Sequence, residues 1–125
     1  MSAFYKFLKH KNGITSFAAI GLELLPLSEH RVSWPSDLMM YEQLYADAVA
    51  EGINFAMQHH LSLEGKPASF LVSEFQELPV DTKFDAVRCA ASVAAWKALG
   101  HEEDEVTFEF NGSWLAKLKD TNEAK

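Results

Sequence analysis

The segment from Leu78 to Lys97 constrains the fold more than any other part of the chain. It opens with a tight turn, Pro79-Val80-Asp81-Thr82, and continues as a run of alanine, serine, valine and cysteine. Apolar positions recur three and four residues apart after this turn, which predicts a helix that ends at Gly100. Because its side chains are so small, we expect this helix to lie unusually close to a neighbouring element.

The N-terminal quarter of the chain predicts a β-hairpin. Phe4–Lys9 is a short aromatic-rich strand, and Ile14–Leu25 is a second strand with alternating apolar positions. Lys11-Asn12-Gly13 lies between them, and Asn-Gly tolerates the positive φ angles of a type I′ turn. A further short strand is expected within His30–Trp34.

The middle of the chain predicts a helix followed by a strand. The helix is expected to begin at Pro35-Ser36-Asp37, with Ser36 or Asp37 as its cap, and to end around His59–Leu61. Gly52 within it indicates close contact with another element. The strand Ala68–Phe75 is expected to place Phe70 and Val72 on one face, and Leu71 and Phe75 on the other.

Capping and C-terminal signals complete the predicted fold. Thr82 with Asp85 fits a capping box at the start of the second helix. Val106–Phe110 alternates as a strand, and Trp114, Leu115 and Leu118 are spaced as in a short helix. We therefore expect one domain over 1–125, with a core over about 4–99 and a strand–helix extension over 104–119. The fold class is α+β, with the helices on one face of a mixed sheet.

Composition limits the kind of partner. The net charge is -7, which disfavours broad contact with a phosphate backbone. Residues 1–34 are the exception, since they hold four basic and two acidic side chains. The first residues lack the apolar core of a signal peptide, and the lone Cys89 cannot form an internal disulfide, so we expect a cytoplasmic protein. No apolar run is long enough to cross a membrane.

Three segments resemble domain IV of elongation factor G, the ribosomal translocase. They are Phe4–Leu27, the stretch Ala48–Ala56 after Pro35, and Val80-Asp81-Thr82 with Ala86–Lys97, and they occur in the family's order. The resemblance implies the fold of a small-subunit ribosomal protein, in which β-strands are followed by βαβα. It also implies a tip that reaches into the ribosomal decoding centre.

The chain departs from that family at the two tip loops. The family's first loop is rich in glycine, whereas His10–Ala19 contains one glycine. The second loop normally carries glycine and an exposed histidine, and Phe75–Pro79 has neither. The sequence also lacks the Gly-x-x-x-x-Gly-Lys-Ser/Thr loop that binds nucleotide phosphates. We therefore expect a free-standing domain with a remodelled tip and without nucleotide-driven chemistry.

The predicted binding residues lie in the N-terminal hairpin, where basic and aromatic side chains are interleaved. Charges would meet phosphates, and rings would stack on bases. The alternative interpretation is a solvated strand edge that lysines protect from aggregation. The candidates are Lys6, Lys9, His10, Lys11 and Phe17.

Other reactive residues have simpler explanations. His59 and His60 are adjacent on a helix and point about 100° apart, so they rarely reach one metal ion. The run His101–Glu105 lacks the ligand pattern of a calcium loop. Cys89 is expected to be a buried, inert thiol, and Asp81 and Asp85 to favour a helix start. We expect no catalytic residue, no metal and no cofactor.

The sequence leaves two functional hypotheses open. The first is non-catalytic binding to the ribosome or to another structured RNA through the N-terminal hairpin. The alternative is an accessory protein or homodimer that binds only protein, including itself, with the same fold. The basic hairpin and the family favour the first hypothesis, and the acidic remainder of the chain favours the second.

Overall fold

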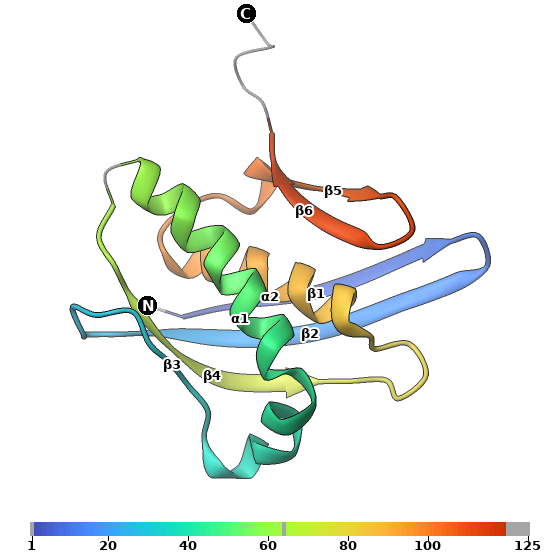
Figure 1. Ribbon diagram of the computed structural model, residues 1–125, viewed down its shortest axis with the longest axis horizontal. Coiled ribbons are helices and arrows are strands. Elements are labelled where there is room, and N and C mark those ends of the chain that lie inside the picture. Colours follow the sequence, from blue (N-terminus) through green and yellow to red (C-terminus); the bar gives the residue numbers. More distant parts are fainter. Residues whose placement is uncertain (1, 64, 120–125) are drawn as a thin grey trace, which may run out of the picture.

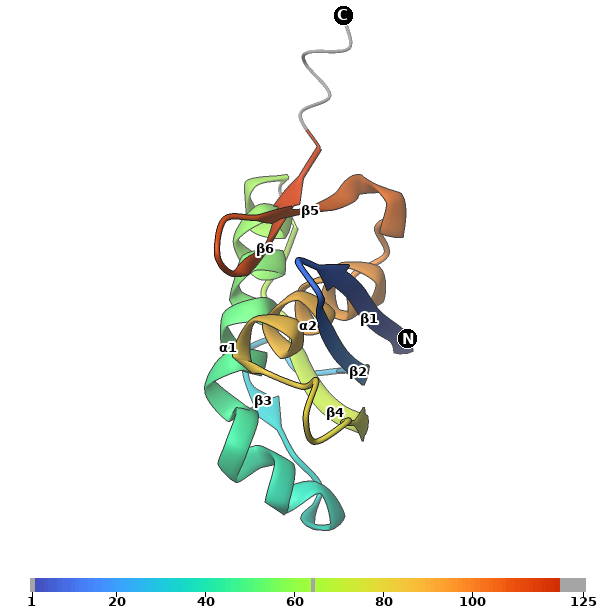
Figure 2. The ribbon, with the colours of Figure 1, turned by 90° about the vertical axis from the view of Figure 1, so that its right-hand side faces the viewer.

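Two helices cover one face of a four-stranded sheet in the computed structural model, which describes residues 2–63 and 65–119 (Figure 1). The sheet order is β1-β2-β4-β3, with β1 (Ser2–Lys11), β2 (Ile14–Leu25), β3 (Val32–Ser33) and β4 (Ser69–Gln76). Among the described strands of this sheet, only the β3–β4 pair is parallel. The helices α1 (Met39–Ser62) and α2 (Phe84–Ala98) lie on the same side of this mixed sheet (Figure 2), which confirms the α+β class.

The N-terminal hairpin forms as the Asn-Gly signal predicts. Asn12 and Gly13 have φ angles of 55° and 78°, the positive values of a type I′ turn. The register pairs Lys11 with Ile14 and continues without a shift to Ser2 and Glu23. Strand β1 is longer at both ends than the predicted Phe4–Lys9, whereas β2 has the predicted bounds Ile14–Leu25.

Helix α2 lies at the centre of the molecule, against α1 on one side and the sheet on the other. Gly52 of α1 makes this close packing possible, since a Cβ there would lie 2.7 Å from Cβ of Ala91 and 2.8 Å from N of Ser92. Ala91 itself is fully buried. The predicted close approach of the small-residue helix is confirmed, and Gly100, with a φ of 97°, follows its end as expected.

The predicted face of Phe75 is wrong. A bulge shifts the register of the β2–β4 pair next to Gly21 and Leu22, and a bulge reverses the side of every residue beyond it. Phe75 therefore lies on the helix-covered face with Phe70 and Val72, where it stacks on Tyr41 and Tyr45 at ring-centroid distances of 4.8 and 5.2 Å.

Both predicted helix caps are absent. A 3-10 turn, Ser36–Leu38, precedes α1, and neither Ser36 nor Asp37 caps it by a side-chain hydrogen bond. At α2 the Thr82 hydroxyl instead donates to the Phe17 carbonyl oxygen at 2.7 Å, and Asp85 accepts from N–H of Trp114 at 2.9 Å. The Thr82 hydroxyl and an Asp85 oxygen thus form tertiary hydrogen bonds, and the two reciprocal bonds of a capping box do not form.

The predicted C-terminal helix is a strand. After the 3-10 turn η2 (Glu103–Glu105), β5 (Val106–Phe110) pairs antiparallel with β6 (Trp114–Leu118) in a separate two-stranded sheet. Because a lone strand leaves its backbone groups unpaired, β5 requires such a partner. The extension over 104–119 is thus a β-hairpin, and its aromatic side chains pack against Phe7 of β1 at centroid distances of 4.9 Å (Phe108) and 5.8 Å (Trp114).

Neither α1 nor α2 has the combination of length and apolar composition that a membrane-crossing helix requires.

Candidate functional site

Three turns gather at one end of the molecule, which we call the tip. They are the β1–β2 turn (residues 11–14), the β4–α2 loop (residues 77–83) and the β5–β6 turn (residues 111–113), at the right-hand end of Figure 1. The fold thus brings segments from the beginning, middle and end of the chain to one surface.

The β4–α2 loop is held rigidly against β2. The Phe17 N–H donates to the Asp81 carbonyl oxygen at 3.0 Å, and the Thr82 hydroxyl donates back to the Phe17 carbonyl oxygen at 2.7 Å. The Thr82 oxygen also accepts from the Leu78 N–H at 2.9 Å. These bonds leave Val80 83% exposed at the loop's apex, so the loop presents an apolar side chain from a fixed backbone.

The structure divides the five predicted binding residues between two faces of the hairpin. Lys6 and His10 lie with Leu8 on the face of the sheet opposite the helices, and His10 Nδ1 lies 2.8 Å from the Thr15 hydroxyl. Lys9 and Lys11 lie on the other face, beneath the β5–β6 hairpin. They do not form one continuous basic surface with Lys6 and His10.

Aromatic rings of the β5–β6 hairpin hold the two lysines on the helix side. Lys9 Nζ lies 5.5 Å from the ring centroid of Phe108 and 6.0 Å from that of Trp114, and Lys11 Nζ lies 5.9 Å from that of Phe110. Such contacts favour a cation over the ring face. Phe17 is 8% exposed and therefore has no open ring face on which a base could stack.

A second basic side chain, which the sequence analysis did not select, joins Lys11 at the tip. Lys83 precedes α2, and both lysines line a hollow of about 120 Å³ at the start of this helix, together with Ser16 and Asp85. The Asp85 carboxylate accepts from the N–H groups of Ala86 and Trp114, at 2.8 and 2.9 Å. The available signal was the position of Lys83 directly after the Val-Asp-Thr turn.

The adjacent histidines of α1 contact different partners. His59 Nδ1 lies 2.8 Å from the Phe55 carbonyl oxygen, whereas His60 Nδ1 lies 2.9 Å from Nε2 of His101. Burial and the neighbouring His101 lower the pKa of His60. Within residues 2–63 and 65–119, no three histidine, cysteine, aspartate or glutamate side chains gather as a metal site would require.

The remaining candidate residues have structural roles. Cys89 is fully buried in α2, and this burial raises the pKa of its thiol to about 12, so it stays protonated near neutral pH. Asp85 anchors the β5–β6 hairpin, and Asp81 contributes a backbone oxygen to the β2 contact. The acidic run contains η2, where Glu102 and Glu105 form a capping box.

Comparisons with known proteins give a likeness in fold alone. No protein-family model matches the sequence, and no curated protein matches it either. A crystal structure of a protein from Thermus thermophilus matches with a TM-score of 0.68 and 21% identity, over 92% of this chain and 22% of that chain. The chain thus spans about a fifth of the length of that protein.

Proposed function

We propose that this chain is a non-catalytic RNA-binding module that contacts the ribosome, or another particle containing structured RNA, through the tip. The observation that carries the proposal is the convergence of Lys11 and Lys83 on the first turn of α2. Two lysine side chains that line one hollow beside a helix start, where the backbone N–H groups carry partial positive charge, suit the phosphates of a nucleic acid.

The resemblance to domain IV of elongation factor G supports this assignment. The chain has the order of β-strands followed by β3-α1-β4-α2 that the resemblance implies, and the family's tip loops correspond to the β1–β2 turn and the β4–α2 loop. In the translocase those loops reach into the decoding centre. The fold likeness to a segment of a much longer Thermus chain is consistent with a module that also occurs within larger proteins.

The charge distribution favours contact over a small surface. The chain as a whole carries a net charge of -7, so a phosphate backbone lying along the molecule would meet repulsion. At the tip, Asp85 is hydrogen-bonded to two backbone N–H groups, and the Glu77 carboxylate accepts from the Tyr45 hydroxyl at 2.6 Å. Lys11 and Lys83 are both exposed there. A cytoplasmic location belongs to the proposal, because ribosome binding requires it.

Co-sedimentation with ribosomes at low and high salt tests the proposal. Normal protein should pellet with ribosomes at low salt and be released as salt rises, because each phosphate contact releases a condensed counterion. The variant Lys11→Glu/Lys83→Glu should bind at least about tenfold more weakly, with a shallower salt dependence. The matched control is Lys66→Glu/Lys117→Glu, which makes the same charge change at exposed lysines outside the tip and should bind as the normal protein does.

The alternative function is protein binding without nucleic acid, and the exposed apolar side chains at the tip favour it. Ile14, Leu78, Val80 and Phe84 are 54%, 46%, 83% and 43% exposed. If the normal protein does not pellet with ribosomes at low salt, or if the tip variant binds unchanged, RNA binding through the tip is wrong. A partner protein, including a second copy of this chain, then becomes the leading hypothesis.

A further inference from the structure

We propose that the free edge of β1 is a self-association surface, on which a second copy of this chain adds its own β1 in the antiparallel direction. The resulting dimer would join two four-stranded sheets into one continuous sheet. This surface shares Lys11 with the proposed RNA contact. The inference does not depend on that function, because the dimer is measured without RNA.

Strand β1 is a long edge strand without the usual interruptions. It ends the sheet order, spans Ser2–Lys11 and pairs with β2 in an unbroken register. It contains neither proline nor a bulge, two of the features that blunt an edge. It does carry Lys6, Lys9 and Lys11, and lysines oppose unspecific pairing, so a strand that pairs here has to meet their charge. Such an edge presents a row of N–H and C=O groups on which another strand can pair.

The hydrogen bonds identify which backbone groups of β1 point outward. Leu8 lies opposite Phe17, whose N–H and C=O are both bonded to the β4–α2 loop and therefore face away from β1. In an antiparallel ladder, the backbone N–H and C=O groups of two opposed residues either all point toward the other strand or all point away from it. The N–H and C=O of Leu8 therefore point away from β2. The Phe4 carbonyl oxygen accepts from Lys97 Nζ at 3.2 Å, so it also points away from β2. Phe4 and Leu8 are four residues apart, as expected when every second residue of the strand points its backbone groups outward.

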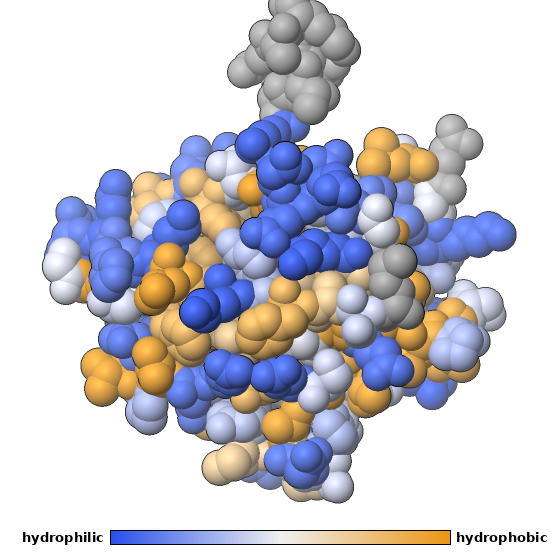
Figure 3. Space-filling view, turned by 180° about the vertical axis from the view of Figure 1, so that it is seen from behind, coloured by the Kyte–Doolittle hydropathy of each residue, from blue (hydrophilic) through white to orange (hydrophobic). Residues whose placement is uncertain are grey.

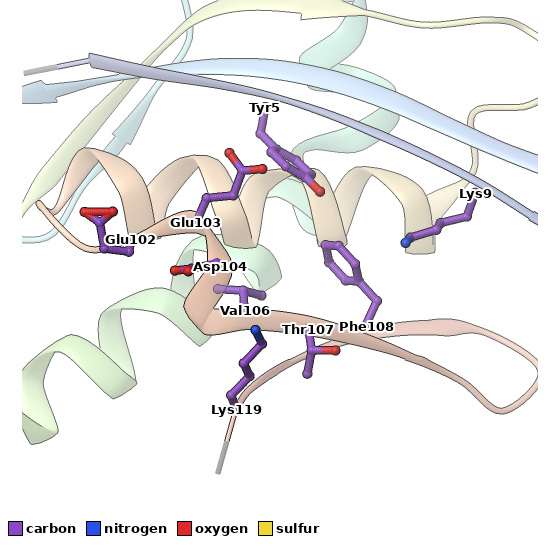
Figure 4. Close-up of a pocket in the computed structure, with 9 residues that line it drawn as sticks. All are labelled: Tyr5, Lys9, Glu102, Glu103, Asp104, Val106, Thr107, Phe108 and Lys119. Atoms are coloured by element: carbon purple, nitrogen blue, oxygen red, sulfur yellow. The ribbon is translucent and has the colours of Figure 1, made fainter. Parts of the chain in front are cut away.

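A groove runs along this edge, between β1 and the η2–β5 segment (Figure 4). Its volume is about 610 Å³, and the rings of Tyr5 and Phe108 project into it. Glu102, Glu103 and Asp104 line one end together with Lys119, and Lys9 lines the other. Carboxylates therefore outnumber lysines beside the start of β1, whereas the groove is basic towards the end of β1. Glu103 is fixed at the acidic end by Lys97 at 3.0 Å.

This charge gradient selects an antiparallel copy of β1. Reversal of the strand places its basic end, with Lys9 and Lys11, beside the acidic η2 of the first copy. The two-fold axis then repeats the same contact at the other end, as an isologous interface requires. In a parallel copy, Lys9 and Lys11 would lie beside the same two lysines of the first copy, and this like-charge contact opposes parallel pairing.

The side chains of β1 on the sheet face opposite the helices add apolar area to the proposed dimer interface. Phe4 and Leu8 are 40% and 48% exposed on the face of the sheet that neither of the described helices α1 and α2 covers. Figure 3 shows apolar side chains mixed with polar ones across this face. An antiparallel register that sets Phe4 of one copy opposite Leu8 of the other adds two apolar cross-strand pairs on this face. The same register sets Lys6 of the two copies opposite each other on the two-fold axis, which offsets part of that gain.

Sedimentation velocity of the full chain over a series of concentrations tests the proposal. The normal protein should shift from monomer to dimer as concentration rises, and added salt should weaken the dimer. Leu8→Pro removes an outward N–H without removing a bond of the β1–β2 ladder, so it should leave a folded monomer. Far-UV circular dichroism verifies that this variant keeps its fold.

A charge-exchange experiment tests the antiparallel direction. Lys11→Glu and Asp104→Lys should each raise the dimer dissociation constant by about tenfold. The double variant should recover most of that loss, because Lys11 of one copy meets η2 of the other. Lys66→Glu, at an exposed lysine away from the edge, is the matched control and should dimerise normally.

Three results would overturn the inference. The first is a normal protein that remains monomeric at concentrations on the order of 1 mM, where even weak specific pairs associate. The second is a folded Leu8→Pro variant that still dimerises, and the third is a double variant no tighter than the single ones. In the first case, binding of an extended lysine-rich peptide by the monomer would assign the groove to another protein.

Discussion

At the residue scale, Gly52 determines how closely the two helices approach. Replacement by alanine in a helix normally stabilises by about 1 kcal/mol. Here the added Cβ would lie 2.7 Å from Cβ of Ala91, and overpacking of this kind costs about 1–3 kcal/mol. We therefore expect Gly52→Ala to lower the midpoint of urea unfolding. Asn54→Ala, on the exposed side of α1, is the control and should leave the midpoint unchanged or raise it. A midpoint of Gly52→Ala above that of the normal protein, as helix propensity alone predicts, would contradict the close packing of α1 on α2.

The contact between His60 and His101 predicts a residue-level pH dependence. The pKa of His60 is lowered in the folded chain, mainly by burial and also by His101. The unfolded chain therefore takes up a proton more readily below about pH 6.5, so stability is full above that pH and falls as pH drops through the folded pKa. We expect His60→Gln to reduce the loss of melting temperature between about pH 7 and pH 5, the range in which histidine titrates.

His59→Gln is the matched control for this measurement, since it removes a neighbouring imidazole that does not contact His101. It should retain the acid sensitivity of the normal protein. If His60→Gln loses melting temperature with acid as steeply as the normal protein does, the His60–His101 contact does not govern this response.

At the scale of elements, Asp85 and Arg88 hold the β5–β6 hairpin to α2. Asp85 accepts from the Trp114 N–H at 2.9 Å, and Arg88 donates to the Trp114 carbonyl oxygen at 2.7 Å. Asp85→Ala leaves one of these backbone groups without its partner, which costs about 1–3 kcal/mol when the group stays buried. We expect faster amide hydrogen exchange across β5 and β6 and unchanged exchange in β2. Uniformly faster exchange in all elements would mean that the hairpin does not open separately.

Element prediction from the sequence succeeds where the signal is local. Asn12-Gly13 specifies the turn by its φ angles, and the small residues of α2 specify its close packing. Prediction fails where the conformation of a segment depends on a partner that is far away in the sequence. The spacing of Trp114, Leu115 and Leu118 suits a helix, but pairing with β5 imposes an extended backbone. Likewise, a bulge turns Phe75 to the helix side, which residue alternation alone does not reveal.

Prediction of the candidate site from the sequence is limited in the same way. The sequence identifies the basic N-terminal hairpin, but a strand's two faces separate Lys6 and His10 from Lys9 and Lys11. The aromatic partners of Lys9 and Lys11 come from the other end of the chain. The position of Lys83 after the Val-Asp-Thr turn places it at the start of α2, but only the topology brings Lys11 beside it, which composition and spacing do not show.

At the scale of the whole molecule, the three tryptophans report on three different regions. Trp34 packs near Phe75 beside β4, Trp96 is buried in α2, and Trp114 packs on Phe7 in β6. Because β5–β6 shares aromatic contacts with β1 and is held to α2 by Asp85 and Arg88, we expect the hairpin to unfold together with the main sheet, as in one cooperative domain, as long as Asp85 is present. Separate opening of the hairpin is expected only in Asp85→Ala.

The prediction is tested with two single substitutions, Trp34→Phe and Trp114→Phe, each of which removes one fluorescent reporter. In each variant, the urea midpoint followed by the remaining fluorescence should coincide with the midpoint followed by far-UV circular dichroism. The comparison is made within each variant, because the two substitutions remove different contacts and change stability by different amounts. If Trp34→Phe shows an early fluorescence change that Trp114→Phe lacks, the change comes from the surroundings of Trp114. The β5–β6 hairpin would then be a separately opening unit, and residues 106–118 would not belong to the cooperative core.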